Sequence, residues 1–212
     1  MTEALIARLT DDLKPVPASR LRMWLVVCAS AGLGLSAIMM WIWFGPRPDL
    51  AAASTTPRFW MKFGYTLALG ALGLWAAKRV ARPGGTGRVP LLLVPAVVAL
   101  LAGIALIDYA LAPVQDRQRM VWGSSALMCP FYIFATSIPL LFAVFAFLRR
   151  MAPTHLSRAG LAGGLTAGAL GAWIYTFHCT ESGLPFLALW YSAGILVVAM
   201  LGLLAGRWAL RW

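Results

Sequence analysis

The chain has 212 residues, of which 61% are hydrophobic and only 12% are charged. A soluble domain of this length has about a quarter of its residues charged, so the composition excludes an ordinary soluble protein and indicates an integral membrane protein. The net charge of +11 does not indicate nucleic-acid binding, because the basic residues lie beside long apolar runs and mark topology.

The N-terminal arm is polar and contains one short amphipathic segment. Apolar residues recur at helical spacing on one face until Pro15 ends the pattern; they are Leu5, Ile6, Leu9 and Leu13. A helix of three turns is marginal alone in water, so this face needs either a lipid surface or a protein partner to cover it. The polar face carries Asp11 and Asp12, which suit an anionic lipid surface poorly and favour a protein partner.

Six apolar runs follow the arm, each near the roughly 20 residues that a membrane-spanning helix needs. They cover residues 23–44, 59–77, 91–111, 126–147, 159–177 and 184–206. No small-residue cleavage site follows the first run, so we expect it to be a retained span and not a signal peptide. The sequence therefore predicts an all-α integral membrane protein. Its expected parts are a cytoplasmic arm with a short amphipathic helix at 1–22, a six-transmembrane-helix bundle at 23–206 and a cytoplasmic tail at 207–212.

The basic residues predict which side of the membrane each loop faces. With the N-terminus inside, the cytoplasmic side holds thirteen of the 18 Lys and Arg residues: Arg8, Lys14, Arg20, Arg22, Lys78, Arg79, Arg82, Arg88, Arg149, Arg150, Arg158, Arg207 and Arg211. The other side holds Arg47, Arg58, Lys62, Arg117 and Arg119. Basic residues concentrate on the cytoplasmic side of membrane proteins, so both termini are expected there, in the inner membrane of a bacterium.

The fifth run has small residues at every fourth position, Gly160, Gly164 and Gly168. This spacing lets helix backbones approach closely in lipid. Packing against another helix of the same chain is the simpler interpretation, and a homodimer is the alternative. Four aromatic residues near the predicted span ends are expected to form an interfacial belt: Trp60, Trp122, Trp190 and Tyr191.

An imidazole, a thiol and a carboxylate fall within four positions between the fifth and sixth runs, at His178, Cys179 and Glu181. Cys129 begins the fourth run on the same extracytoplasmic side. Two thiols on an oxidising side can form a disulfide or share a soft metal ion, with His178 or Glu181 as further ligands. The alternative is a structural role, either as unpaired cysteines or as a constitutive disulfide. Cys28, in the first run, is expected to be a small buried hydrophobe.

Other chemistry finds little support in the sequence. Asp108 and Lys62 are the only charged residues inside the predicted spans, and both lie near outer ends, whereas a proton relay needs acidic residues near the midplane. The chain has no CxxC motif. A quinone-linked membrane thiol redox enzyme and a small metal transporter are therefore the weaker alternatives, and we expect the protein not to be an enzyme.

Three motifs together resemble those of one known family. They are Leu5-Ile6-x-x-Leu9-x-x-Asp12-Leu13-x-Pro15-Val16, Met128-Cys129-Pro130, and His178-Cys179-x-Glu181-Ser182 followed by Phe186 and Trp190-Tyr191. Over nearly its whole length the chain resembles the NrsF-type negative regulators of sigma F, which are six-span anti-sigma factors of the bacterial inner membrane.

The resemblance implies a role in transcription regulation. The arm would sequester an extracytoplasmic-function sigma factor and keep it from RNA polymerase, without contacting nucleic acid itself, through Leu5, Ile6, Leu9, Asp12 and Leu13. On the outer side Cys129 and Cys179 would sense metal or oxidative stress, and the bundle would then release the sigma factor. The resemblance requires no cofactor apart from a transient heavy-metal ion at the cysteine pair, and it leaves the roles of His178 and Glu181 open.

Overall fold

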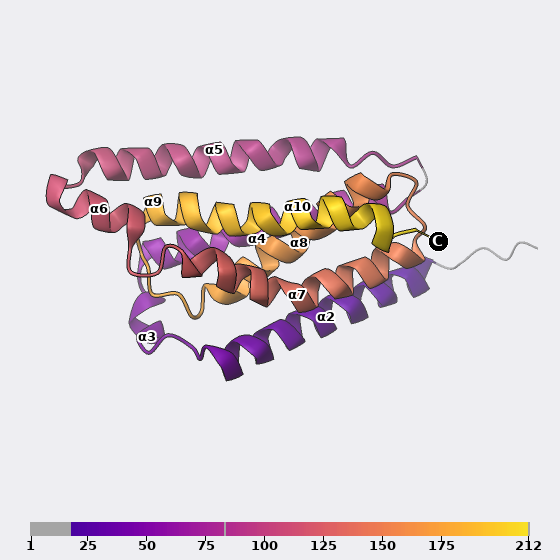
Figure 1. Ribbon diagram of the computed structural model, residues 1–212, viewed down its shortest axis with the longest axis horizontal. Helices are drawn as coiled ribbons and strands as arrows, with labels where there is room; N and C mark the ends of the chain where they lie inside the picture. The colour runs from indigo at the N-terminus through magenta and orange to yellow at the C-terminus, as the bar shows by residue number, and fades with distance from the viewer. Residues whose placement is uncertain (1–17, 83, 212) are drawn as a thin grey trace, which may run out of the picture.

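The computed structural model describes residues 18–82 and 84–211, and every regular element within them is a helix (Figure 1). In chain order these are α2 (Ala18–Trp43), α3 (Leu50–Ala53), α4 (Pro57–Val80), α5 (Arg88–Leu111), α6 (Val114–Trp122), α7 (Met128–Arg150), α8 (Leu156–Tyr175), α9 (Leu184–Phe186), the π-helix η1 (Leu187–Tyr191) and α10 (Ser192–Ala209). The predicted amphipathic helix at Leu5–Leu13 lies outside the described residues.

Four of the long helices could cross a membrane by their length and composition. They are Met23–Trp43, Arg88–Leu111, Met128–Arg150 and Leu184–Ala209. The helices α4 and α8 occupy the other two predicted ranges but are less apolar. Half of α8 is Gly and Ala, and α4 carries a buried lysine together with several glycines. Hydropathy alone therefore supports four spans among the described residues.

The helix α8 is the centre of the bundle, with α10, α4 and α7 packed around it (Figure 1). Its small residues allow this arrangement. A Cβ atom on Gly160 would overlap the carbonyl oxygen of Gly202 in α10, and one on Gly164 would stand 2.6 Å from the carbonyl oxygen of Val198. The small-residue face is thus covered within the chain, as the simpler of the two interpretations predicts, and offers no free surface for the homodimer alternative.

The bundle has two distinct ends (Figure 1). The start of α2, the end of α10 and the α4–α5 and α7–α8 connections lie at one end. At the other end lie segments 44–56, 112–127 and 176–183. The second end contains α3 and α6, two short helices that the apolar pattern did not predict, because both lie in the polar connections between the runs. We call this second end the loop end.

The sixth apolar run is not one regular helix, because a π-helical turn at Leu187–Tyr191 separates α9 from α10. A π turn holds one residue more than an α turn and so changes the direction of the side chains around it. Tyr191 is fully buried here, with its ring centroid 5.7 Å from that of Tyr175. The expectation that Tyr191 belongs to an interfacial belt is therefore wrong, whereas Trp60 and Trp122 are more than half exposed.

Gly160→Ala is expected to destabilise the bundle by about 1–3 kcal/mol, because the added methyl group meets the backbone of α10, which cannot move aside like a flexible side chain. Thermal unfolding of the detergent-solubilised protein measures this. The matched control is Gly103→Ala in α5, where an added Cβ meets nothing within 4 Å. That change should leave the melting temperature unchanged or raise it slightly, since Ala favours helices. Equal melting temperatures for the two variants would contradict the proposed packing.

Candidate functional site

The structure brings Cys129 and Cys179 together at the loop end. Cys129 lies in the first turn of α7, and Cys179 lies in the segment between α8 and α9. Both side chains are buried, with 0% and 2% of their surface exposed, and both are free thiols. Both side chains belong to one buried hydrophobic cluster, which also contains Tyr175 and Tyr191. Cys28 is also buried, as expected, but packs in a separate hydrophobic cluster with residues of α4, α7 and α8.

Two buried cations hold the backbone at Cys179. Its carbonyl oxygen accepts a hydrogen bond from Nη1 of Arg47 at 3.1 Å and another from Nζ of Lys62 at 3.3 Å. Lys62 also donates to the carbonyl oxygen of Glu181. The side chain of Lys62 comes from the second turn of α4 and is only 4% exposed. We call residues 176–183, which contain Cys179, the cysteine segment. Its hydrogen bonds attach it to α4 and to the α2–α3 connection.

Arg47 is itself fixed by a carboxylate. Its Nε and Nη2 atoms donate to the two oxygens of Asp49, each at 2.7 Å. The hydrogen bond to Asp49 raises the pKa of Arg47 above its usual range, and the same bond lowers the pKa of Asp49. The backbone N–H of Arg47 also donates to the carbonyl oxygen of Phe177 at 2.9 Å. Asp49 therefore holds the Arg47 guanidinium in position to bind the Cys179 carbonyl oxygen.

His178 contributes to the fold of the site through a different contact. Its Nδ1 lies 2.8 Å from the carbonyl oxygen of Gly45, to which it donates in the matching tautomer. Its ring packs among Phe44, Tyr132 and Tyr175, with centroids 5.5 to 6.0 Å away. In this arrangement the imidazole joins the end of α8 to the end of α2.

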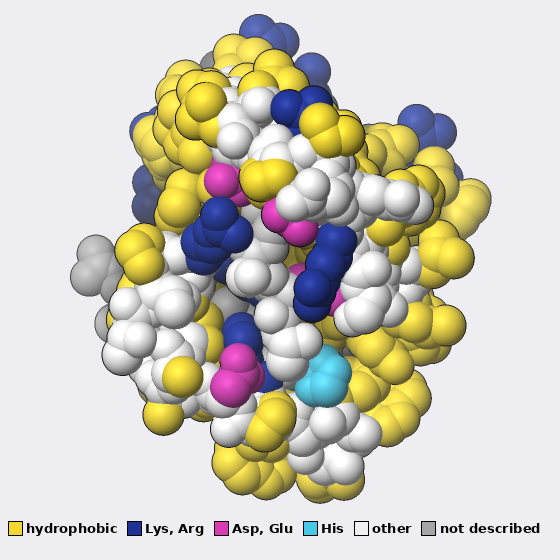
Figure 2. Space-filling model, turned by 90° about the vertical axis from the view of Figure 1, so that its left-hand side faces the viewer, with side chains coloured by type: hydrophobic (Ala, Val, Ile, Leu, Met, Phe, Trp, Pro, Cys, Tyr) yellow, Lys and Arg dark blue, Asp and Glu magenta, His cyan; other side chains and the backbone are white. Residues whose placement is uncertain are grey.

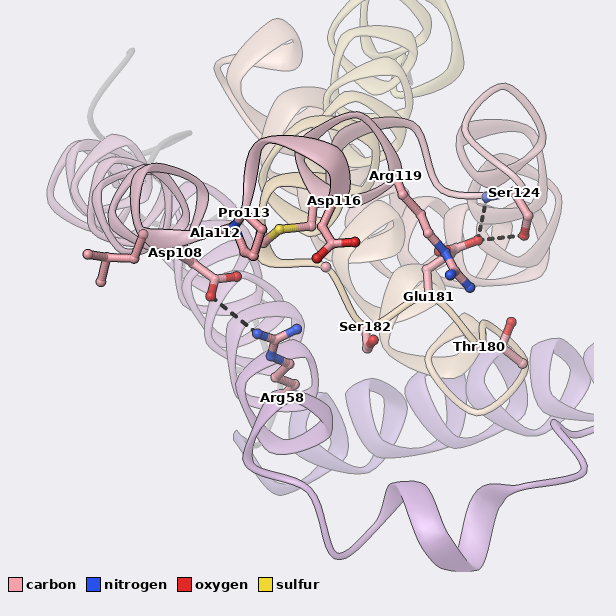
Figure 3. Close-up of a pocket in the computed structure, with 13 residues that line it drawn as sticks. Arg58, Asp108, Ala112, Pro113, Asp116, Arg119, Ser124, Thr180, Glu181 and Ser182 are labelled. Carbon is pink, nitrogen blue, oxygen red and sulfur yellow. Dashed lines mark hydrogen bonds and ion pairs between the residues drawn. The ribbon is translucent and has the colours of Figure 1, made fainter.

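The Glu181 carboxylate binds Ser124. Its Oε1 accepts hydrogen bonds from the backbone N–H and the hydroxyl of Ser124, at 2.7 and 2.6 Å (Figure 3). Gly123 makes this approach possible, because a Cβ atom there would stand 2.5 Å from Oε2 of Glu181 and its φ of +52° suits glycine. The carboxylate therefore fixes the cysteine segment to the connection between α6 and α7.

The sequence did not indicate the residues that line the thiols on their inner side. Tyr175 and Tyr191 are buried in the same cluster as Cys129 and Cys179. The Lys62 ammonium lies over the Tyr191 ring, 5.2 Å from its centroid. The one available signal was that Lys62 is among the few charged residues inside a predicted span, where an ionisable side chain is by default a candidate for function.

The surroundings favour negative charge on the Cys179 sulfur. The neighbouring Cys129 thiol has the largest effect and lowers the pKa of Cys179, with further lowering by the Lys62 charge. Burial acts in the opposite direction but is outweighed. Of the two thiols, Cys179 is therefore the one whose surroundings favour the thiolate, which is the nucleophilic form.

The donor set around the pair is small. Within residues 18–82 and 84–211, no group of three or more His, Cys, Asp or Glu side chains is arranged to hold a metal ion. The four candidate residues thus divide into a thiol pair and two residues, His178 and Glu181, whose polar atoms contact Gly45 and Ser124.

A polar cavity of about 660 Å³ opens on the loop end beside the cysteine segment (Figure 3). Its charged lining residues are Arg58, Asp108, Asp116, Arg119 and Glu181. An ion pair of 3.2 Å joins Arg58 to Asp108. Asp108, the one acidic residue within the predicted spans, therefore lies in the cavity wall. Figure 2 shows this end of the molecule, where basic and acidic side chains are interspersed around hollows in the surface. Neither thiol lines the cavity, because segment 180–183 lies between.

Comparison with known proteins gives one consistent result. The family described as negative regulator of sigma F matches residues 9–212. The chain is 37% identical over 215 residues to the anti-sigma-F factor NrsF of Caulobacter vibrioides (strain NA1000 / CB15N), covering 100% of this chain and 98% of that protein. It is 35% identical over 212 residues to the probable anti-sigma-F factor NrsF of Azospira oryzae (strain ATCC BAA-33 / DSM 13638 / PS), covering 100% of this chain and 99% of that protein.

No solved structure matches the chain. The relatives are named as regulators and not as enzymes. Because the family match spans nearly every residue and both relatives align over nearly their full length, the chain belongs to the family of negative regulators of sigma F.

Proposed function

We propose that this protein is a membrane-bound anti-sigma factor that holds an extracytoplasmic-function sigma factor through residues 1–22 and releases it when Cys129 and Cys179 respond to metal or oxidative stress. The observation that carries the proposal is that two buried free thiols share one cluster at the loop end. Helix α2, which follows the arm in sequence, begins at the opposite end of the bundle. Signal and partner would therefore act on opposite sides of the membrane.

The charge distribution supports an orientation with both termini in the cytoplasm of a bacterial inner membrane. Basic residues lie in the last turns of α4, α7 and α10, at the end of the bundle that carries the termini; they are Lys78, Arg79, Arg149, Arg150 and Arg207. This is the distribution expected of a cytoplasmic face. With α8 surrounded by α4, α7 and α10, we propose that α4 and α8 also span the membrane, which completes six spans.

In this mechanism His178 and Glu181 hold the cysteine segment in place. Their contacts with Gly45 and Ser124 hold the cysteine segment against the connections on either side of it. A covalent or ligand-induced change at the thiols would pull on these contacts. Transmission to the arm is a coupling between two sites and requires two states of the bundle with different affinities for the sigma factor.

Leu9→Asp is expected to weaken sigma-factor binding at least about thirtyfold, equivalent to ~2 kcal/mol, because it places a carboxylate on the apolar face of the predicted arm helix. Co-purification of the sigma factor from solubilised membranes measures this, and deletion of residues 1–20 should abolish it. The matched control is Ala7→Asp, which adds the same charge to the opposite face and should bind normally. Unchanged binding by Leu9→Asp would remove the arm from the mechanism.

Replacing both Cys129 and Cys179 with Ser is expected to leave the sigma factor bound but to abolish its release. A reporter gene under a sigma-dependent promoter, followed after exposure of cells to cadmium or hydrogen peroxide, should stay at its uninduced level. Cys28→Ser is the control, since this thiol packs in a separate cluster, and it should respond as the unchanged protein does. Normal induction in the double variant would show that the thiols are not the sensor.

A further inference from the structure

A second polar cavity opens at the end of the bundle opposite the loop end, where α8 begins and α10 ends (Figure 1). Its volume is about 390 Å³, and none of its lining residues is acidic. Its polar lining consists of three arginines, one histidine and two residues with hydroxyl groups: Arg158, Arg207, Arg211, His155, Thr154 and Ser157. We call it the arginine cavity.

The close contact between α8 and α10 brings these polar groups together. A Cβ atom on Gly206 would stand 2.7 Å from the carbonyl oxygen of Leu156, so the absence of a side chain there lets the last turn of α10 lie against the start of α8. The next residue, Arg207, then reaches α8, and its Nε donates to Oγ of Ser157 at 3.1 Å. This hydrogen bond fixes the guanidinium at the cavity and leaves its two terminal nitrogens as donors for a ligand.

The three arginines of the cavity have no carboxylate partner within residues 18–82 and 84–211. The acidic residues in that part of the chain all lie at the loop end; they are Asp49, Asp108, Asp116 and Glu181. Positive charges that line one cavity repel one another, and a bound anion would offset this repulsion. The guanidinium fork matches the oxygens of a phosphate group and binds them by two parallel hydrogen bonds. The cavity therefore has the charge and the donors of a phosphate site.

The surface of α10 next to the cavity favours a lipid as the source of the phosphate. Met200, Leu204 and Arg207 are separated by four and three residues, so they form one row along the helix. The first two are 43% and 50% exposed, and the helix is long and apolar enough to span a membrane, so this row is suited to contact acyl chains. Trp208 is 70% exposed beside Arg207, as is typical of an aromatic residue at the depth of lipid head groups.

We infer that the arginine cavity binds the head group of an anionic phospholipid, with Arg207 and Arg211 on its phosphate and an acyl chain along Met200 and Leu204. The inference goes beyond the proposed function, because it concerns neither the thiols nor the sigma factor. Zwitterionic phospholipids also carry a phosphate, but their cationic group would add positive charge beside the arginines. The bound lipid stabilises the bundle by linkage, since it binds the state in which α8 and α10 are in contact.

The test uses the full chain, purified in detergent and depleted of lipid. Dioctanoyl phosphatidylglycerol, dioctanoyl phosphatidylcholine and inorganic phosphate are titrated separately, with native mass spectrometry to measure bound lipid and thermal unfolding to measure stability. Phosphatidylglycerol should bind at least about tenfold more tightly than phosphatidylcholine and should raise the melting temperature more than either other probe. Equal binding of the two lipids, or equal stabilisation by inorganic phosphate at the same concentration, overturns the inference.

A pair of double variants separates the cavity from the general basic charge at this end of the bundle. Arg207→Gln with Arg211→Gln should weaken phosphatidylglycerol binding at least about tenfold, because it removes two guanidinium groups from the site. The matched control is Lys78→Gln with Arg82→Gln, which removes two exposed charges at the same end but outside the cavity. The control should bind as the unchanged protein does. An equal loss in both double variants overturns the inference.

If the arginine double variant does not fold, Arg211→Gln alone decides. Arg211 lies beyond the end of α10, so its loss should leave the lipid-free melting temperature unchanged and weaken phosphatidylglycerol binding about fivefold, the effect of one basic residue near an anionic membrane surface. Unchanged binding by this variant contradicts the inference.

A last variant tests whether the acidic residues near the N-terminus occupy the cavity instead of a lipid. It is the full chain with three substitutions, Glu3→Gln, Asp11→Asn and Asp12→Asn. Phosphatidylglycerol should bind it as tightly as it binds the unchanged protein. Binding that becomes at least about tenfold tighter would show that these carboxylates compete for the arginines, and it would overturn the assignment to a lipid.

Discussion

The close contact between α8 and α10 is the constraint on which the bundle depends. Because Gly160 and Gly164 have no side chains, the two backbones meet directly, and α4 and α7 can then close around the remaining faces of α8. In lipid, where burial of apolar surface does little to join helices, such close packing is the main attraction between them. A central helix made of larger residues would push its neighbours apart, and the residues at its end would no longer meet.

This packing brings the C-terminal end of α8 close to two cationic side chains, Arg47 and Lys62. Carbonyl groups at a helix C-terminus lack intrahelical partners and carry partial negative charge, so cations are stabilised there. The chain after Tyr175 presents the carbonyl oxygens of Phe177 and Cys179, and Arg47 binds both, one by its backbone N–H and one by its side chain. Lys62 completes the set from α4. The same buried cations that bind these backbone carbonyl oxygens also place positive charge next to Cys179.

The sequence predicted what depends on composition and spacing, and it did not predict what depends on packing. The apolar runs located the long helices, and the glycine spacing anticipated the close contact of α8. Tyr191 is expected at the interface because a residue near a span end has the same sequence pattern whether it faces lipid or protein, whereas in the structure it lies in the π turn at Leu187–Tyr191 and is fully buried. His178 and Glu181 were grouped with the thiols because they are neighbours in sequence, whereas their side chains contact Gly45 and Ser124. Lys62 was recognised as unusual, but its partners lie about 120 residues away along the chain and could not be inferred without the fold.

The helix α7 is the element that best connects the thiols with the start of α2. It carries Cys129 in its first turn and packs along α2, where Gly32 allows contact with Leu140 and Ala143. In its last turn the Arg150 guanidinium lies 3.6 Å from the ring centroid of Trp24, six residues after the start of α2. A disulfide at one end of α7 would constrain its position against α8, and a shift of α7 would alter its contacts along α2. Under the proposed function, this chain of contacts would provide a route from the thiols to the start of α2, which follows residues 1–17 in sequence.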